Sequence, residues 1–312
     1  MMERIGLIDV DTRNFPNIAL MKISAFHKSI GDNVEWYDPM FGGHFDKVYM
    51  SKVFSWTPDY AYPINADEIQ KGGTGYAISM VDGKEVFDKS KDVNLDPAIE
   101  HIYPDYSLYP QLTQNTAFGF LSRGCPRGCS FCIVAGKEGR KSVKVANLEE
   151  FWHGQSKVVL CDPNILACPD WAELLEQCAA SGAEFDFNQG MDARMLTREK
   201  IDALNQLRIK EIHFAWDRYN ERDLILPKLE LYAKYTSFQP HAHKAIVYVL
   251  TNYDTTFEQD LDRIYTLRDM GYWPYVMIYD KKNSDKKYRR LQRWVNMRSV
   301  FGSVKKFEDY KG

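Results

Sequence analysis

The first 115 residues alternate between short apolar runs and one amphipathic stretch. The run Arg4–Val10 predicts a buried strand, and Ile18–Ile30 carries its apolar side chains on one helical face. Two further strands are predicted at Val34–Tyr37 and Lys47–Phe54. A strand, a helix and a strand at this spacing favour a parallel, doubly wound domain of the Rossmann or flavodoxin-like type over residues 1–115.

Residues 116–282 repeat a unit in which an apolar strand is followed by an amphipathic helix. The predicted strands are Ala117–Leu121, Val158–Cys161, Glu184–Asn188, Glu211–Ala215, Ala245–Leu250 and Tyr275–Ile278. The predicted helices are Leu148–Gln155, Pro169–Ser181, Thr197–Leu207, Leu224–Tyr235, Thr256–Met270 and Tyr288–Val300. Six such units predict an α/β domain that forms a partial (βα)6 version of a TIM-type barrel. In such barrels the loops at the carboxyl ends of the strands meet at one mouth.

Residues 283–312 are predicted to form a basic C-terminal helix and tail. Between Lys281 and Lys306 there are ten Lys and Arg residues, with Asp285 as the only acidic residue. Apolar residues such as Leu291 and Trp294 fall near helical spacing, so one face can pack while the other presents charge. Two interpretations stay open, a solvated helix face and a surface that contacts the phosphate backbone of a nucleic acid.

Composition sets outer limits on the class of protein. The chain has 312 residues, of which 45% are hydrophobic, and a formal net charge of −3, which is typical of one large or two ordinary globular domains. It contains no run of 18 apolar residues, so no membrane-spanning segment is predicted. The six cysteines occur without a secretory signal, which favours a reducing, cytoplasmic location.

Three of the cysteines lie within eight residues, at the spacing Cys-x3-Cys-x2-Cys. Cys125, Cys129 and Cys132 follow the first predicted strand of the second block. Three thiolates on one loop can hold a 4Fe–4S cluster and leave its fourth iron open to a small molecule. A zinc site is the weaker interpretation because no partner pair of Cys or His stands at finger spacing. The remaining cysteines are interpreted as buried, small apolar side chains, at Cys161, Cys168 and Cys178.

This cysteine spacing, with the aromatic Phe131 just before the last cysteine, resembles the signature of the radical SAM superfamily. The resemblance implies that S-adenosylmethionine binds the open iron and is cleaved reductively to a 5′-deoxyadenosyl radical, which abstracts hydrogen from a substrate. It also implies an electron donor such as flavodoxin or ferredoxin. Phe131 is then expected to present its ring or backbone to the adenine.

Polar residues follow the predicted strands at the end where such a cofactor would bind. By chemical role, Asp162 or Asn164 suits the cofactor ammonium, and Arg194 suits its carboxylate. Asp192 or Asp217 suits the ribose hydroxyls. The alternative for each residue is a turn or a cap at the start of the next helix.

The N-terminal block resembles the cobalamin-binding-like domain that precedes the barrel in one class of radical SAM proteins. The Asp-x-His-x-x-Gly motif that supplies the lower cobalt ligand in many such domains is absent, since His27 and His44 lie outside it. Cobalamin is therefore not favoured, and the domain is predicted to act as a lid or substrate platform. The loop that follows its first strand, Asp11 to Asn14, is then expected to contact the substrate. The block holds no cysteine, which argues against a methylthiotransferase.

Two further functions stay open beside this favoured one. A cobalamin-dependent radical SAM methyltransferase would need the first block to bind cobalamin. A non-catalytic iron–sulfur module for redox sensing or nucleic-acid binding would use the cysteines and the basic helix without S-adenosylmethionine. The identity of the substrate does not follow from the residues.

Overall fold

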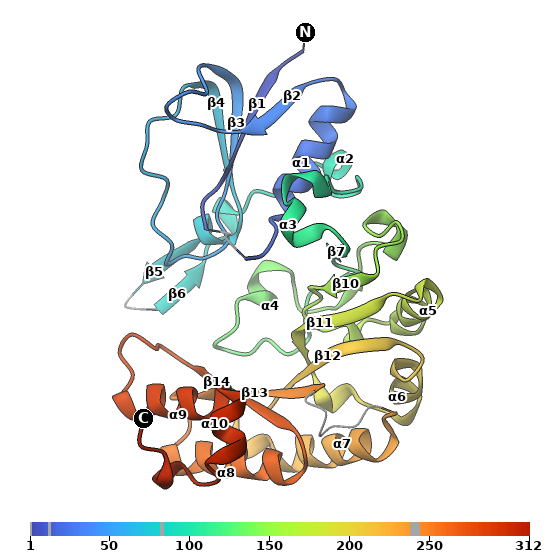
Figure 1. Ribbon diagram of the computed structural model, residues 1–312, viewed down its shortest axis with the longest axis vertical. Coiled ribbons are helices and arrows are strands. Elements are labelled where there is room, and N and C mark those ends of the chain that lie inside the picture. Colours follow the sequence, from blue (N-terminus) through green and yellow to red (C-terminus); the bar gives the residue numbers. More distant parts are fainter. Residues whose placement is uncertain (1, 12–13, 82–83, 238–243) are drawn as a thin grey trace. The chain divides into compact units, whose positions relative to one another are not determined.

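Short apolar runs form the strands of two sheets in the computed structural model, and most are followed by helices (Figure 1). The structure describes residues 2–11, 14–81, 84–237 and 244–312. They fall into two units. The first comprises residues 1–120, 124–141 and 145–158, and the second comprises residues 121–123, 142–144 and 159–312.

The first unit is built on a four-stranded parallel sheet with the strand order β2-β1-β3-β4. Its strands are β1 (Arg4–Asp9), β2 (Asn33–Trp36), β3 (Phe45–Ser51) and β4 (Ala66–Gly72), and the helix α1 (Ile18–Ser29) connects the first two. This order agrees with the predicted strand–helix–strand opening.

Both faces of this sheet are covered. Ile5 and Leu7 of β1 pack with Leu20 of α1 on one face, and Ile8 packs with Val48 of β3 on the other. An apolar run without polar alternation is what a strand buried on both faces requires. The helix starts where it does because Asn17 caps it, with its side-chain oxygen 3.2 Å from the Leu20 amide nitrogen that donates to it.

Smaller elements complete the first unit. They are η1 (Thr74–Tyr76), β5 (Ile78–Val81), β6 (Lys84–Phe87), η2 (Lys89–Lys91), α2 (Pro97–Glu100), η3 (Tyr106–Leu108), α3 (Pro110–Thr113), β7 (Thr116–Gly119), α4 (Val134–Lys137) and η4 (Leu148–Glu150). β5 and β6 form an antiparallel hairpin. The first two residues of β10 (Lys157–Leu160) also belong here, and the Lys157 amide donates to the Asn115 carbonyl at 3.0 Å.

The second unit has a sheet whose strands lie in the order β14-β13-β12-β11-β10. The last four in the chain are β11 (Glu184–Met191), β12 (Arg208–Ala215), β13 (Ala245–Thr251) and β14 (Trp273–Ile278), and each pairs in parallel with the next. A short antiparallel pair, β8 (Ser122–Arg123) and β9 (Val143–Lys144), lies outside this sheet.

Helices lie between these parallel strands and after the last one, β14. They are α5 (Trp171–Ser181), α6 (Arg198–Leu204), α7 (Arg222–Tyr235), α8 (Phe257–Asp269), α9 (Lys286–Asn296) and α10 (Arg298–Ser303), with the short turns η5 (Ile165–Ala167), η6 (Ala193–Met195), η7 (Tyr219–Glu221) and η9 (Phe307–Asp309). Local sequence sets their ends. Thr256 and Gln259 form a reciprocal capping box at the start of α8, and Gly182 ends α5 in the left-handed conformation with φ of 66°.

The predicted α/β class with parallel sheets is confirmed, and the closure of the second sheet into a partial barrel stays a prediction. The predicted helix Leu148–Gln155 is wrong, because only the turn Leu148–Glu150 forms. Gly154 there has φ of 93°, and the Trp152 indole donates to the Gln155 carbonyl at 2.7 Å, so the chain turns back instead of continuing.

The predicted C-terminal helix Tyr288–Val300 is two helices, α9 and α10. They are separated at Met297, whose φ of −86° and ψ of 98° are extended. Leu291, Trp294 and Val295 of α9 share a core with Ile246 and Trp273 of the sheet. The C-terminal segment is therefore packed onto the second unit, although the sequence suggested a limit at residue 283.

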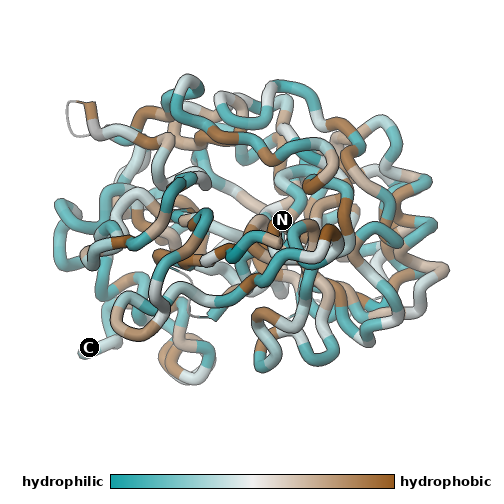
Figure 2. Tube along the Cα trace, turned by 90° about the horizontal axis from the view of Figure 1, so that it is seen from above, coloured by the Kyte–Doolittle hydropathy of each residue, from teal (hydrophilic) through white to brown (hydrophobic). Residues whose placement is uncertain are grey.

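Hydrophobic and hydrophilic segments alternate along the described part of the Cα trace (Figure 2). Within the part of the chain that the structure describes, no helix is both long enough and apolar enough to cross a bilayer.

Candidate functional site

The cysteine loop spans residues 124–141 of the first unit and is closed at its two ends. The Cys125 amide donates to the Gly139 carbonyl at 3.2 Å. Gly124 has φ of 87°, and a Cβ there would lie 2.1 Å from the Lys141 carbonyl oxygen, so only glycine fits. Between the first two cysteines Gly128 also has a positive φ, of 59°. These two glycines let a short segment fold back on itself.

The three cysteines of this loop are more accessible than the other three. Cys132 is exposed and Cys125 and Cys129 are half-buried, and the Cys132 amide donates to the Cys129 carbonyl at 3.0 Å in a tight turn. A thiol must lose its proton to bind iron, and accessibility to solvent favours the thiolate.

Cys161, Cys168 and Cys178 are buried, which confirms their interpretation as small core side chains. Burial raises the pKa of Cys161 to about 12 and also raises the pKa values of Cys168 and Cys178. A buried thiol that resists deprotonation is a poor iron ligand.

The loop carries the donor type that an iron–sulfur cluster uses, since three thiols lie within eight residues, on a segment that glycines bend and that solvent reaches. Across the described ranges, no three His, Cys, Asp or Glu side chains converge as the ligands of a single metal ion. Phe131 lies in the same loop and is half-buried.

The residues on either side of this loop, 121–123 and 142–144, belong to the second unit and form what we call the base of the loop. Ser122 and Arg123 of β8 pair with β9, so the chain enters and leaves the cysteine loop through adjacent strands. One Asp162 oxygen accepts from the Leu121 amide at 3.1 Å, and the other accepts from the Ser122 amide and from the Ser122 hydroxyl at 2.7 Å. The Ser142 hydroxyl donates to the Asn164 carbonyl at 3.0 Å. Residues at the carboxyl end of β10 therefore anchor both strands of the base.

Asp162 is thus bonded to protein groups through both of its oxygens. It is 6% exposed, and burial raises its pKa to about 6 although three donors act in the opposite direction. Asn164, which the sequence offered as the alternative ammonium partner, is also buried.

The other predicted cofactor residues of the second unit gather at the carboxyl ends of β11 and β12. The Arg194 Nε donates to Asp192 Oδ1 at 2.7 Å, and Arg194 Nη1 donates to Glu221 Oε1 at 2.5 Å. Burial is the main cause that raises the pKa of Asp217 to about 6, and the nearby Glu221 carboxylate raises it further. Sequence reasoning missed Glu221.

A buried ion pair beneath this cluster was also missed. Arg263 of α8 is 0% exposed and donates to the Trp216 carbonyl (2.5 Å), the Leu250 carbonyl (2.6 Å) and Asp260 Oδ1 (2.5 Å). It therefore joins the carboxyl ends of β12 and β13 and fixes the backbone next to Asp217. The available signal was its place in the apolar stripe of the helix, three residues after Asp260.

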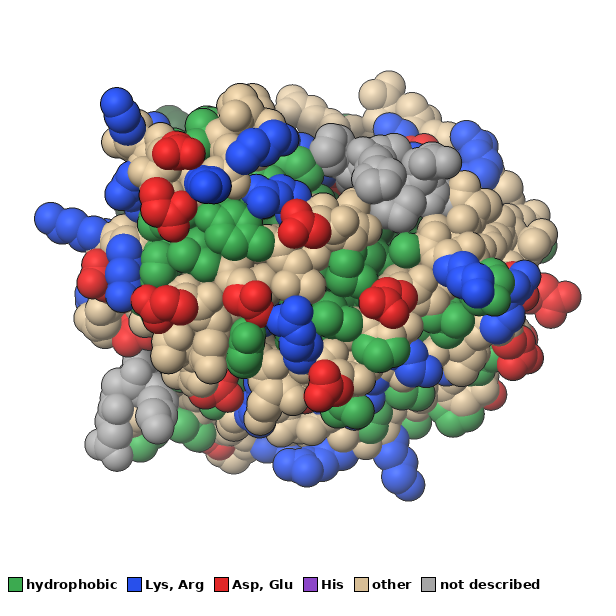
Figure 3. Space-filling model, turned by 90° about the horizontal axis from the view of Figure 1, so that it is seen from below, with side chains coloured by type: hydrophobic (Ala, Val, Ile, Leu, Met, Phe, Trp, Pro, Cys, Tyr) green, Lys and Arg blue, Asp and Glu red, His purple; other side chains and the backbone are tan. Residues whose placement is uncertain are grey.

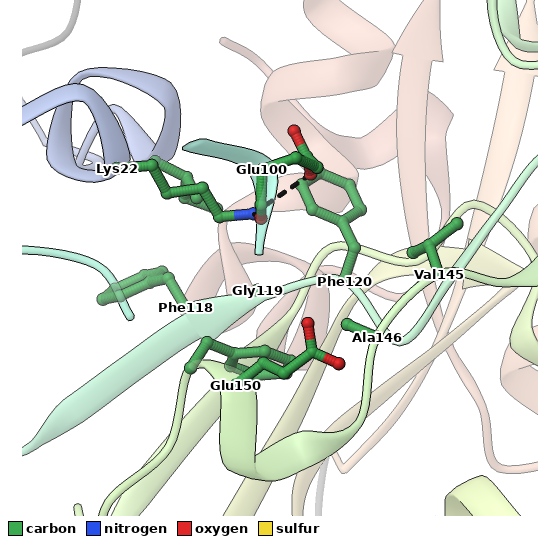
Figure 4. A pocket seen from close by; sticks show the side chains of 10 residues that line it. Lys22, Glu100, Phe118, Gly119, Phe120, Val145, Ala146 and Glu150 are labelled. Atoms are coloured by element: carbon green, nitrogen blue, oxygen red, sulfur yellow. Dashed lines mark hydrogen bonds and ion pairs between the residues drawn. The ribbon is translucent and has the colours of Figure 1, made fainter. Parts of the chain in front are cut away.

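Two small hollows lie within single units. In the first unit, Phe118, Phe151 and other side chains surround a pocket beside the Lys22–Glu100 ion pair (Figure 4). Its cavity volume of about 20 Å³ is close to the smallest that holds one water molecule, so it admits no cofactor. In the second unit, a more open hollow of about 130 Å³ is lined by Tyr219, Asn220, Asp254 and Gln259.

The loop expected to contact the substrate is described in part. Asp11 Oδ2 accepts from the Val53 amide at 2.6 Å, which ties the end of β1 to the residues after β3. Residues 12–13 of that loop lie outside the described residues. The cysteine loop and Phe131 belong to the first unit, and the strand-end residues from Asp162 to Asp217 belong to the second. Comparison with protein-family models and with curated proteins gives no match.

Proposed function

We propose that the protein is a radical SAM enzyme. The observation that carries the proposal is the contrast between the two sets of cysteines. The Cys-x3-Cys-x2-Cys set lies on an accessible, glycine-bent loop, while the other three thiols are buried, which raises their pKa values. Held by Cys125, Cys129 and Cys132, a 4Fe–4S cluster would supply the electron that cleaves the C5′–S bond of S-adenosylmethionine to methionine and a 5′-deoxyadenosyl radical, which would become 5′-deoxyadenosine by taking a hydrogen atom from the substrate.

The strand-end residues of the second unit have the chemistry to hold the rest of the cofactor. We assign the ammonium to Asn164 at the end of β10, because both oxygens of the alternative, Asp162, already accept hydrogen bonds, and we assign the carboxylate to Arg194. Because Arg194 already donates to Glu221, a ligand carboxylate has to share or replace that contact. Asp192 or Asp217 is assigned to the ribose, and Phe131 to the adenine.

The first unit is proposed to serve as a lid or substrate platform and not as a cobalamin carrier. Its two candidate histidines have partners in the protein. His27 Nδ1 lies 2.7 Å from Asp32 Oδ2 and its Nε2 lies 3.0 Å from the Tyr49 hydroxyl, while His44 Nε2 lies 3.2 Å from Asp67 Oδ1. A cobalt ligand would need one of these ring nitrogens. A doubly wound first domain and a partial barrel in the second unit are part of the same proposal.

The partners and the location follow from the chemistry. The reaction consumes one electron, so an electron donor such as flavodoxin or ferredoxin is required, and thiolate ligands favour the reducing cytoplasm. The main competing functions are a cobalamin-dependent methyltransferase and a non-catalytic iron–sulfur module. Saturable binding of hydroxocobalamin at micromolar protein, seen in its visible spectrum, would favour the former.

Single Cys→Ala variants test which cysteines bind the cluster. After anaerobic reconstitution with iron and sulfide, Cys125→Ala, Cys129→Ala and Cys132→Ala should lose most of the cluster absorbance and of the bound iron and sulfide. Cys178→Ala is the matched control and should keep them, because its thiol is buried in the core. The proposal fails if Cys125→Ala keeps a full cluster or if a buried cysteine proves to be the ligand.

A further inference from the structure

The helix α9 has one face in the core of the second unit and one face in solvent. Tyr288, Leu291, Trp294 and Val295 are buried, with Leu291, Trp294 and Val295 at 0% exposure. The helix also borders β14, because Gln292 donates to the Val276 carbonyl at 3.0 Å and Asn296 accepts from the Val276 amide at 2.8 Å. The outer face of α9 is therefore held rigidly.

That outer face, with the loop before it, presents a cluster of cations that we call the α9 basic surface. Its members are all exposed: Lys281, Lys282, Lys286, Lys287, Arg289, Arg290 and Arg293. None of them forms an ion pair with a carboxylate of the residues that the structure describes. The two acidic residues next to these cations bind neighbouring groups. Asp285 caps α9 by accepting from the Lys287 amide, and Asp280, just before Lys281, accepts from the Asn283 side chain.

Elsewhere in the described residues many Lys and Arg side chains pair with carboxylates, as Arg222 does with Asp262 at 2.6 Å. Figure 3 shows a face on which Lys and Arg side chains lie among Asp and Glu side chains. The whole chain has a net charge of −3. An unneutralised positive segment on an acidic protein is the electrostatic footprint of a polyanion partner.

Several of these cations are already ordered by contacts within the protein. Arg289 donates to the carbonyls of Lys281 and Lys282 at 3.0 and 3.1 Å, and the Arg290 guanidinium lies 5.1 Å from the centre of the Phe307 ring. A guanidinium held over a ring keeps N–H groups at its edge that can donate to phosphate oxygens. Ordering before binding reduces the entropy lost on association.

An aromatic side chain stands on the strand that α9 borders. Tyr275 of β14 is 41% exposed, and its ring lies 5.7 Å from that of Tyr248 in an edge arrangement. An accessible ring and a row of cations are the two parts with which proteins bind single strands, with a base on the ring and the backbone on the cations.

We propose that the α9 basic surface binds the phosphate backbone of a single-stranded nucleic acid, with Tyr275 stacking on a base. The inference does not rest on the radical SAM assignment, because it needs neither the cluster nor S-adenosylmethionine.

Fluorescence anisotropy with a labelled single-stranded oligonucleotide of 20 uridines tests this surface on the full chain. The triple variant Lys282→Ala, Lys286→Ala, Arg293→Ala removes three cations that have no packing contact with a ring. It should weaken binding about tenfold at 50 mM salt and reduce the salt slope by about 2, since each phosphate contact contributes about 0.7 on a single strand. Tyr275→Ala should weaken binding by about tenfold through lost stacking.

The matched control removes three exposed cations elsewhere, as Lys89→Ala, Lys157→Ala, Arg208→Ala, and should bind like the wild type. The proposal is overturned if wild-type protein binds no oligonucleotide at 50 mM salt, or if both triple variants lose affinity equally. Binding of an acidic protein by this surface without binding of the oligonucleotide also overturns it. Unchanged affinity of Tyr275→Ala contradicts the single-strand assignment.

Discussion

Both oxygens of Asp162 accept hydrogen bonds from the segment that leads into the cysteine loop. This residue-scale fact changes what Asp162 is suited to do. Its three donors come from Leu121 and Ser122, three to four residues before Cys125. A buried carboxylate with both oxygens occupied is better placed to position the loop than to meet a ligand ammonium.

The variant Asp162→Asn distinguishes a role in positioning the cysteine loop from a role in binding the ligand ammonium. The amide places an N–H donor opposite a backbone donor, so the base of the loop should shift and cluster content should fall severalfold. The affinity of the loaded protein for S-adenosylmethionine should change little. Ser122→Ala removes one of the three bonds and should give a smaller loss. Full cluster content with affinity weakened tenfold or more would instead assign Asp162 to the ammonium.

The raised pKa of Asp217 is expected to make the free energy of unfolding depend on pH. Burial raises its pKa in the folded protein from 3.8 to about 6, so its stabilising contribution is complete below pH 3.8 and is lost as pH rises through about 6. Asp217→Asn cannot ionise. Between pH 5 and pH 7.5 the variant should gain about 1 kcal/mol in free energy of unfolding relative to the wild type. Urea denaturation at the two pH values measures this, and a constant difference would contradict it.

At the scale of elements, α8 joins two strands through a buried ion pair. Arg263 and Asp260 are both 0% exposed, and Arg263 also donates to carbonyls at the ends of β12 and β13. Removing one charge of such a pair leaves the other buried without its partner, which is more costly than removing both.

Arg263→Met should therefore destabilise the protein by about 3 kcal/mol or more, and the double variant with Asp260→Leu should recover part of that loss. Denaturant unfolding measures both. Arg198→Met is the control, because Arg198 pairs with Asp202 on an exposed helix face and should cost less than about 1 kcal/mol. If the double variant is the less stable of the two, the ionic account of this element is wrong.

Elements with continuous apolar runs were predictable from sequence, and elements held by distant partners were not. The run that forms β13 was predicted at Ala245–Leu250 and lies at Ala245–Thr251, because burial on both faces leaves a clear signal. The two-residue strand β8 has no such signal. Its contact with Asp162 joins residues 40 apart, and its pairing with β9 joins both ends of a loop.

In the candidate site, too, local features were predictable from sequence and contacts between distant residues were not. The cysteines were predictable because one short loop carries all three, and the chemistry of three thiols is local. The contacts of Arg194 were only half predictable: Asp192 is two residues away, but Glu221 comes from the next strand–helix connection. Arg263 of α8 was harder to recognise, because an Arg in a helix is usually exposed and only its position in the apolar stripe signals burial.

At the scale of the whole molecule, three regions have separate proposed tasks. The first unit supplies the cysteine loop, the second supplies the strand-end cluster and the base of the loop, and α9 supplies a basic surface. The central claim is that these residues support the reductive cleavage of S-adenosylmethionine.

Formation of 5′-deoxyadenosine tests that claim most directly. Reconstituted protein is incubated without oxygen with dithionite and S-adenosylmethionine, and the products are quantified by liquid chromatography and mass spectrometry. We expect 5′-deoxyadenosine and methionine in equal amounts from the wild type and from Cys178→Ala, and none above background from Cys125→Ala. A fully loaded wild-type cluster that forms no 5′-deoxyadenosine, or equal amounts from wild type and Cys125→Ala, would contradict it.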